Sequence, residues 1–432
     1  MSDKSNKTDV IVVGAGPAGI TCAITLARAG REVVLIERGL FAGSKNVFGG
    51  AIYTKPTKEI FPNFEQDAPL ERRNITHNFM ILGEEDSTSI AYRKEGNESY
   101  SVIRGKFDRW MAQKAKEAGV ILVEQTVVRA LIKNGTKVVG VKTELEDYFA
   151  DIVVLADGVN SLLAKQIKLR KEIEPKDVAL SVKEVIKLDK DIINQRFNIK
   201  DDEGVIGEIF GGSMLGILGL GFLYTNKDSV TIGLGVTLDD LVENNYRPFE
   251  VLEKLKQHPT IAPLIEGGVL KEYSAHLIPE GGYNKVPKLC DDGVMVVGDA
   301  AMLVDNLHWE GTNLAMLSGK LAAQTAIEAF EKGNFSRKTL KNYEKKLQNS
   351  FIMKDLKTYR KLMPIAHERK KAFMGYYLKK INSFFEMFTT VDGVPKKENY
   401  HKFIKSIFTD RKFGELCKDI WALIRLVWSI LI

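Results

Sequence analysis

The feature that most constrains the fold is a glycine loop near the N-terminus, placed between a strand and a helix. The apolar run 9–14 leads into Gly14-Ala15-Gly16-Pro17-Ala18-Gly19, after which a helical pattern continues to Arg28. A second apolar strand follows and ends at Glu37. A GxGxxG motif in a strand–helix–strand setting is typical of units that hold a dinucleotide. The sequence therefore predicts a Rossmann-type domain at the N-terminus.

Each glycine of this loop has a distinct physical role in such a unit. Gly14 permits the tight turn, Gly16 lets the backbone approach a pyrophosphate, and Gly19 allows close packing of helix on strand. The helix N-terminus offers amide donors and positive potential, and Glu37 has the spacing of a ribose-binding acid. The motif alone leaves open whether the dinucleotide is FAD or NAD.

Two later segments favour FAD. VVLADG (153–158) and VMVVGDAA (294–301) each place an acid beside glycine at the end of an apolar strand. Asp157 and Asp299 could each simply cap a turn. Taken in order with the glycine loop, the segments resemble the p-hydroxybenzoate-hydroxylase-like class of flavoproteins.

That resemblance implies specific roles at the flavin. Asp299 would bind the ribityl chain, the helix start Gly311-Thr312-Asn313 would face the isoalloxazine edge, and Arg104 would lie near the adenosine or pyrophosphate. A surface ion pair is the alternative role for Arg104. The full predicted FAD site comprises Gly14, Gly16, Pro17, Ala18, Gly19, Glu37, Arg38, Asn46, Gly49, Gly50, Arg104, Val128, Ala156, Asp157, Gly158, Gly298, Asp299, Gly311, Thr312 and Asn313.

At 432 residues the chain is long enough for two connected domains. We expect an α/β fold of the class named above. Residues 1–177 and 279–335 form a discontinuous FAD-binding domain, and residues 178–278 form a second α+β domain with an antiparallel sheet. Residues 336–432 form a basic helical C-terminal region.

Several long stretches resemble the electron-transfer-flavoprotein:quinone oxidoreductases, most closely their FixC-type members. They are GSKNVFGGAIY (43–53), YSVIRGKFDRWMAQKAKEAG (100–119), GFLYTNKDSVTIGLGV (221–236) and the stretch 256–289. The resemblance implies that FAD takes electrons from an electron-transfer flavoprotein of FixA/FixB type and passes them to a quinone. A complex that also divides electrons between quinone and ferredoxin is left open.

Cysteine content indicates where an iron–sulfur cluster could sit. Long members of the resembled family ligate a [4Fe–4S] cluster with four cysteines, whereas this chain has only Cys22, Cys290 and Cys417, which are far apart. The cluster is therefore expected in a separate ferredoxin-like partner of FixX type, and no metal site is expected in this chain.

The resemblance also points to a quinone side in the second domain. Quinone-reducing members have a glycine pair before Phe-Leu-Tyr, and here the corresponding stretch is Gly219-Leu220-Gly221-Phe222-Leu223-Tyr224. Only the first glycine of the pair matches. Gly211-Gly212 is the other possible counterpart, and a purely structural role in the sheet is the alternative for all these glycines.

Charge is distributed unevenly along the chain. Residues 335–432 have 22 Lys and Arg against 9 Asp and Glu, a net charge of +13, whereas the upstream part has −7. Such a surplus can serve nucleic acid, an anionic membrane or an acidic partner. No recognition motif supports nucleic acid. The C-terminal segment 419–432 is apolar and has Trp421 and Trp428 one heptad apart, which suits either a helix at a membrane surface or one packed on the protein.

We expect a cytoplasmic protein, peripheral on the inner face of the membrane, because the polar N-terminus lacks a signal-peptide pattern. Direct NAD(P)H binding is unsupported, since no second GxGxxG in a strand–helix setting occurs. His308 and Trp309 are expected near the flavin or its entrance, with a structural role as the alternative, and no general acid is assigned. The alternative functions are a geranylgeranyl-reductase-type isoprenoid reductase and a flavin monooxygenase.

Overall fold

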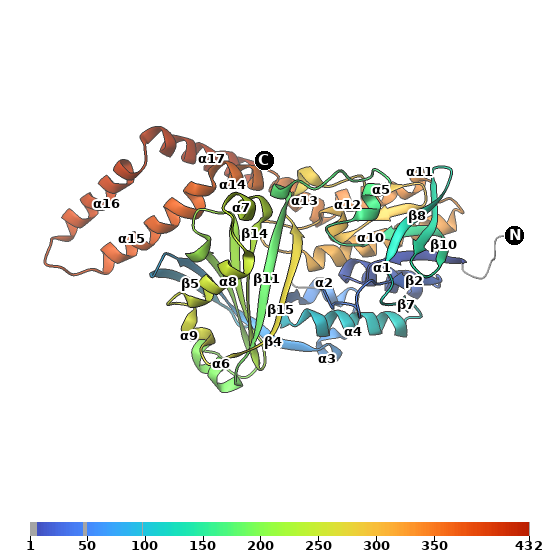
Figure 1. Ribbon diagram of the computed structural model, residues 1–432, viewed down its shortest axis with the longest axis horizontal. Helices are drawn as coiled ribbons and strands as arrows, with labels where there is room; N and C mark the ends of the chain where they lie inside the picture. Colours follow the sequence, from blue (N-terminus) through green and yellow to red (C-terminus); the bar gives the residue numbers. More distant parts are fainter. Residues whose placement is uncertain (1–6, 46–49, 97, 432) are drawn as a thin grey trace. The chain divides into compact units, whose positions relative to one another are not determined.

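The computed structural model describes residues 7–45, 50–96 and 98–431, which divide into two compact units (Figure 1). Unit 1 comprises 1–72, 98–178 and 276–357, and unit 2 comprises 73–97, 179–275 and 358–432. The first domain predicted from the sequence includes 73–97, and 336–432 is predicted to be a separate region. In the structure, residues 73–97 group with unit 2 because they supply two strands to its sheet.

Unit 1 is built on a mostly parallel sheet. The strands of this sheet are β1 (Lys7–Val13), β2 (Val33–Ile36), β7 (Ile121–Val123), β8 (Val128–Asn134), β9 (Lys137–Thr143), β10 (Asp147–Leu155), β16 (Cys290–Asp291) and β17 (Val294–Val296). Unit 1 also contains β3 (Ala51–Tyr53) and β6 (Ser99–Val102), which pair with each other outside this sheet. Its helices are α1 (Pro17–Arg28), α2 (Thr54–Lys58), α3 (Phe64–Asp67), α4 (Arg104–Glu117), α5 (Leu162–Gln166), α10 (Thr312–Glu331), α11 (Arg337–Leu340), α12 (Asn342–Asn349) and α13 (Phe351–Thr358).

The sheet order of unit 1 is β16-β17-β10-β1-β2-β7, with the β8–β9 hairpin attached to β10. Strands β17, β10, β1, β2 and β7 pair in parallel. Parallel strands covered on both faces are expected to be continuous apolar runs, as β1 and β10 are. The predicted β–α–β unit at the N-terminus is thereby confirmed.

Unit 2 combines a largely antiparallel sheet with a helical extension. Its strands are β4 (Leu70–Leu82, beginning in unit 1), β5 (Ser87–Arg93), β11 (Val178–Lys187), β12 (Glu203–Gly211), β13 (Gly219–Thr225), β14 (Ser229–Thr237) and β15 (Val269–Pro279). Its helices are α6 (Lys190–Phe197), α7 (Leu238–Glu243), α8 (Pro248–Gln257), α9 (Ala262–Ile265), α14 (Leu362–Lys371), a π-helical turn (Ala372–Tyr376), α15 (Tyr377–Thr389), α16 (Lys396–Asp410) and α17 (Phe413–Leu431).

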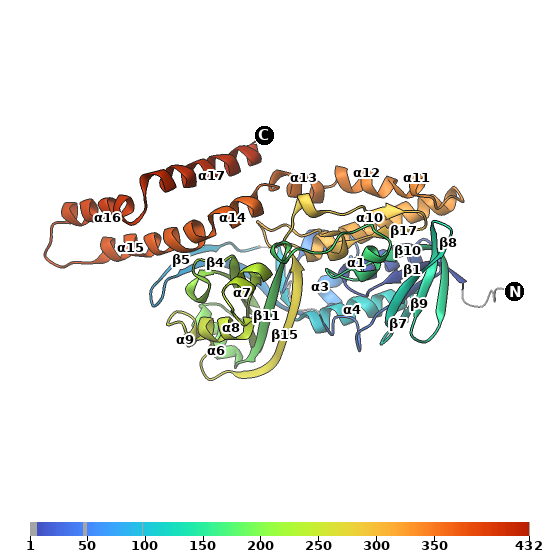
Figure 2. The same cartoon turned by 45° about the horizontal axis from the view of Figure 1, so that its top comes forward.

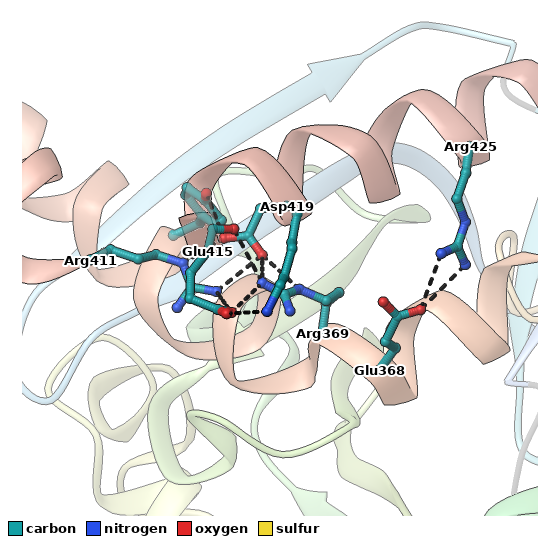
Figure 3. Close-up of polar contacts among 8 residues, drawn as sticks. Glu368, Arg369, Arg411, Glu415, Asp419 and Arg425 are labelled. Carbon is teal, nitrogen blue, oxygen red and sulfur yellow. Dashed lines mark hydrogen bonds and ion pairs between the residues drawn. The ribbon is translucent and has the colours of Figure 1, made fainter. Parts of the chain in front are cut away.

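The C-terminal helices of unit 2 fold back on one another. Both ribbon views show α16 returning along α15 and α17 returning along α14 (Figures 1 and 2). Asp419 of α17 is fully buried and accepts hydrogen bonds from Arg369 of α14, Arg411 before α17 and Tyr377 of α15 (Figure 3). Arg369 also pairs with Glu415 at 2.9 Å. One buried carboxylate therefore holds α17 to the preceding helices.

Burial raises the pKa of Asp419, but the hydrogen bonds from Arg411, Arg369 and Tyr377 lower it by more. The net pKa therefore lies below the ordinary aspartate value. A carboxylate with a depressed folded-state pKa stabilises the fold at neutral pH. That contribution is lost as the pH falls through the folded-state value.

We expect Asp419→Asn to release α17, because the partly buried guanidinium groups of Arg369 and Arg411 lose their buried counter-charge. Removing one partner of a fully buried ion pair costs about 3–5 kcal/mol, so the cost here should lie below that range and above that of an exposed pair. Hydrogen exchange of the α17 amides should become much faster. The matched control is Glu368→Gln, which removes the exposed pair between Glu368 and Arg425 (3.3 Å) that also joins α14 to α17. Exposed pairs contribute about 0–1 kcal/mol, so equal effects of the two substitutions would contradict this account.

Candidate functional site

The glycine loop has the geometry that a dinucleotide requires. Gly14 has φ +103°, and a side chain there would lie 2.2 Å from the Ala156 carbonyl oxygen. A side chain at Gly19 would lie 1.9 Å from the carbonyl oxygen of Gly14. At Gly16, by contrast, the position of a Cβ has no atom of another described residue within 4 Å. Two glycines are thus required by packing, and the third leaves open space.

The start of α1 lies at that open space. Pro17 occupies the first turn, Gly16 is the N-cap, and no side chain caps the helix. Its first turn contains no acidic residue. Uncapped amides at a helix N-terminus form a favourable site for a phosphate group. The residues present therefore fit a pyrophosphate at this position.

Glu37, at the end of β2, lies directly beside the glycine loop. Its Oε2 accepts a hydrogen bond from the Ala15 N–H (2.8 Å), and its Oε1 accepts one from the Gly39 N–H (2.6 Å). A carboxylate oxygen has two lone pairs, so both oxygens can accept a further bond from a ribose hydroxyl. Arg38, the next residue, is exposed.

The strand-end loop at Asp299 joins this site from β17. Gly298 has φ +62°, donates its N–H to Ser318 Oγ (2.9 Å), and would contact Ala18 of α1 if it had a side chain. Burial raises the pKa of Asp299 to about 6, although Arg104 and Arg170 oppose the shift. Asp299 is half-buried, and its carboxyl group has no hydrogen-bond partner among the described residues. Such a group suits hydrogen bonding to a ligand hydroxyl.

The strand-end loop at Asp157 is held differently. The Ser161 hydroxyl donates to Asp157 Oδ1 (2.9 Å), and Gly158 has φ +75°. Burial raises the pKa of Asp157. The carbonyl oxygen of the neighbouring Ala156 lies so close to Gly14 that no side chain fits there. The loop therefore contributes both a polar group and close backbone packing.

The start of α10 is fixed by side-chain hydrogen bonds. Asn313 donates its backbone N–H to Glu310 Oε1 (2.7 Å), and its side chain bonds to the Tyr53 N–H and the Thr57 hydroxyl. Thr312 Oγ1 accepts a hydrogen bond from Arg104 (3.3 Å). These contacts hold the amides at the start of α10 in place.

Arg104 is buried and forms a two-pronged ion pair with Asp108 at 2.8 and 2.9 Å. The alternative prediction for Arg104, a surface ion pair, is wrong, because both Arg104 and Asp108 are buried. Its guanidinium orients the start of α10 through Thr312 and adds positive charge near Asp299 and Glu310.

Sequence reasoning missed three ionisable groups of unit 1, of which Arg170 is buried and Glu310 and His276 are half-buried. Arg170 donates to the carbonyls of Val159 (2.5 Å) and Ala300 (3.3 Å), so it bridges the two strand-end loops. Burial raises the pKa of Glu310 to about 7, and burial together with Arg38 and Arg104 lowers that of His276 to about 4. None of these residues lies in a recognisable motif, so no local pattern indicated them.

Some predicted residues lie elsewhere or outside the described part of the chain. Asn46 and Gly49 are outside the described residues. Gly50 is buried and accepts a hydrogen bond from the Val102 N–H (2.8 Å), and Val128 begins β8 in a half-buried position. His308 pairs with Asp305 at 2.9 Å. Trp309 has φ +53°, which is an uncommon backbone conformation for a bulky residue.

The four glycines predicted on the quinone side are closely packed in unit 2. A side chain at Gly219 would lie 2.9 Å from Val236, and one at Gly221 would lie 3.0 Å from Ile209. Gly211 and Gly212 have positive φ and pack against Leu82. Any contact from these glycines to a ligand would have to come from the backbone.

Comparisons with known proteins agree with this geometry. Residues 7–198 match a model of the FAD binding domain, and residues 348–428 match the ETF-QO/FixC family C-terminal domain. Protein FixC of Azotobacter vinelandii is 43% identical over 98% of this chain and 100% of its own length. A probable electron transfer flavoprotein-quinone oxidoreductase, YdiS of Escherichia coli (strain K12), is 41% identical over 92% of this chain and 93% of its own.

Solved structures confirm the predicted fold class. A geranylgeranyl bacteriochlorophyll reductase-like protein from Thermoplasma acidophilum has a TM-score of 0.73 with 24% identity, covering 97% of this chain and 99% of its own. Identity at that level speaks for the fold alone. Together with the family matches and the near-full-length relatives, the fold and the glycine-loop geometry lead to one conclusion: the chain is a FAD-binding oxidoreductase that belongs to the ETF-QO/FixC family.

Proposed function

We propose that the chain accepts electrons from an electron-transfer flavoprotein of FixA/FixB type and passes them to a quinone. The observation that carries this proposal is the near-full-length similarity to FixC proteins and to YdiS, combined with a site built for FAD. Bound FAD supplies the redox chemistry, since it can take up two electrons and release them singly. The protein's own residues bind and orient it.

In this proposal the loop at Gly16 and the start of α1 hold the pyrophosphate, and Glu37 holds the ribose. Asp299 binds the ribityl chain, and the amides at the start of α10 stabilise negative charge on the flavin ring. Oriented amides at a helix N-terminus favour an adjacent anion. The side-chain hydrogen bonds of Asn313 and Thr312 keep this helix start in position, while the Asn313 N–H itself donates to Glu310.

A separate ferredoxin-like protein of FixX type supplies the [4Fe–4S] cluster in this scheme. Cys22 and Cys290 are buried and Cys417 is exposed, and three cysteines are too few for a four-thiolate site. Among the described residues, no group of histidine, cysteine and acidic side chains is arranged to hold a metal ion.

We further propose that the C-terminal helices place the protein on the inner membrane surface, within reach of a quinone. None of the described helices combines the length and the apolar character that crossing a bilayer requires. In α17, Leu416, Asp419 and Ala422 are buried, whereas Trp421 (59% exposed) and Trp428 (65% exposed) face outward. Outward apolar residues also extend along the two preceding helices, namely Phe385, Phe388, Ile404 and Phe408. Exposed tryptophans among basic residues suit a lipid headgroup region.

The decisive test of electron transfer is quinone reduction by the purified protein, driven by a reduced electron-transfer flavoprotein. We expect stoichiometric FAD and quinone reduction that depends on the donor flavoprotein and on a co-expressed ferredoxin-like partner. Rapid reaction of the reduced protein with oxygen, coupled to hydroxylation of an aromatic substrate, would instead favour a monooxygenase. Reduction of an isoprenoid double bond would favour the reductase alternative.

The Gly16→Val variant tests the pyrophosphate site. The new side chain meets no protein atom, so the chain should fold, but it fills the space that the pyrophosphate needs. We expect FAD content to fall by more than about tenfold with an unchanged thermal midpoint. Gly414→Val is the matched control, because Gly414 also has open space around it and lies far along the chain in α17. Full flavin content in Gly16→Val would refute the assignment.

Vesicle flotation tests the membrane surface. We expect the protein to float with vesicles rich in phosphatidylglycerol, and the double variant Trp421→Ser, Trp428→Ser to remain in the soluble fraction. Phe351→Ser, which changes an exposed apolar residue of α13 (46% exposed), should float normally. If the unsubstituted protein fails to float and the same surface instead binds the ferredoxin-like partner, these helices serve partner binding and the membrane proposal is wrong.

A further inference from the structure

The sheet of unit 2 has two faces of different character. On one face the core is apolar and includes Val182, Leu223, Ile232 and Leu234. Side chains alternate between the faces of a strand, so the residues between these core positions lie on the opposite face. That second face contains polar and aromatic residues beside the aliphatic Val185 and Ile206.

One row crosses the second face in register. Phe79 of β4 pairs with Glu208 of β12, Glu208 with Phe222 of β13, Phe222 with Gly233 of β14, and Gly233 with Lys183 of β11. Strands lie about 4.8 Å apart, so the row from Glu208 to Lys183 spans about 14 Å. Both end groups are buried, with 8% and 3% of their surface exposed.

The floor of this row is aromatic. A side chain at Gly233 would lie 2.3 Å from the tip of the Phe222 ring and 2.9 Å from Lys183 Cβ, so the ring lies across Gly233. Tyr224 lies beside Phe222, with ring centroids 5.3 Å apart. Phe222 is buried, with 2% of its surface exposed, and its ring is tilted by 36° to that of Tyr224. Gly233 is therefore needed to make room for the Phe222 ring.

Polar groups stand at both ends of the floor. At one end, His77 Nδ1 lies 3.5 Å from Glu208 Oε1. At the other, Lys183 pairs with Glu272 (3.3 Å), which also accepts a hydrogen bond from Ser274. The face therefore combines two neighbouring aromatic rings with ionisable groups at opposite edges.

Glu208 is the group in this row whose surroundings point to a ligand. Its second carboxyl oxygen, Oε2, is buried and has no hydrogen-bond partner among the described residues. A buried carboxyl oxygen without a partner is costly, and a donor or acceptor from a bound molecule would remove that cost. His77 retains 20% of its side-chain surface and can exchange protons with water.

We propose that the His77–Glu208 pair hydrogen-bonds to the electron acceptor and supplies the protons that it takes up. This inference rests on the proposed function. Reduction of a quinone to a hydroquinone takes two electrons, which come through the bound flavin, and two protons. At each carbonyl oxygen an O–H bond forms, while an O–H bond of Glu208 or an N–H bond of His77 breaks. Water restores the proton of the pair through His77.

The opposite face of the same sheet provides a matched control. Glu184 is also buried, but it lies on the other face of β11 and pairs with Lys256 of α8 at 2.8 Å. Glu184→Gln therefore removes a buried carboxylate from the same sheet without touching the proposed site. Its effect measures what loss of a buried charge does to the fold alone.

The test compares two acceptors with chemically reduced protein. Ferricenium takes up an electron without a proton, whereas a water-soluble quinone needs both. We expect Glu208→Gln to lower the ratio of quinone to ferricenium rates by about 10²-fold, the usual range for loss of a proton-transferring group. The solvent deuterium isotope effect on quinone reduction should rise, Glu208→Asp should recover part of the rate, and Glu184→Gln should keep the ratio.

The possible outcomes separate this inference from the function on which it rests. A protein that reduces ferricenium but no quinone would overturn the proposed function and its acceptor together. A protein that reduces quinone with an unaltered ratio and isotope effect in Glu208→Gln would overturn only the role of the pair. The same loss of ratio in Glu184→Gln would show a structural effect and also overturn it.

Discussion

The backbone of unit 1 is tightly packed around α1, and the proposed flavin site depends on this packing. Gly19 lets α1 approach the glycine loop, and Gly319 of α10 would place a side chain 2.1 Å from the Ala18 carbonyl oxygen. Gly298 would likewise contact Ala18. Four elements, β1, β17, α1 and α10, are thus brought together around a single turn of helix because their side chains are absent or small. The space at Gly16 exists because its neighbours are packed this tightly.

Unit 2 uses glycine differently. Gly219 and Gly221 face the apolar core, where their neighbours fill the space of a side chain. Gly233 faces the other side and makes room for the Phe222 ring. The same residue type therefore serves packing on one face of the sheet and the shape of a surface on the other, and only the register of the strands separates the two.

Much of unit 1 could be predicted from its sequence because its motifs are local. The turn at Gly14, the acid at Glu37 and the strand-end Asp299 all lie at fixed distances from apolar strands, and periodicity places them. Glu208 and His77 could not be found in this way. They lie 131 positions apart in the chain, and only the pairing of β4 with β12 brings them together.

Helical periodicity alone also could not assign the C-terminal region. The apolar spacing of 419–432 fits a helix on a membrane and a helix on a protein equally well. Asp419 shows that one face of this helix packs on the protein, because its partners come from α14, α15 and the segment before α17. The sequence around a single acid in an apolar helix does not indicate which distant residues will bind it. Only the folded chain shows that these partners surround Asp419.

The exposed thiol of the chain lies on α17. Cys22 and Cys290 are buried, and burial raises the pKa of both, to about 12 for Cys290, which suppresses the reactive thiolate. Cys417 is exposed on α17, two residues before the anchoring carboxylate. A thiol-directed dye therefore labels the native chain at one place. The colour and mobility of that dye report directly on whether α17 is seated, without any engineered cysteine.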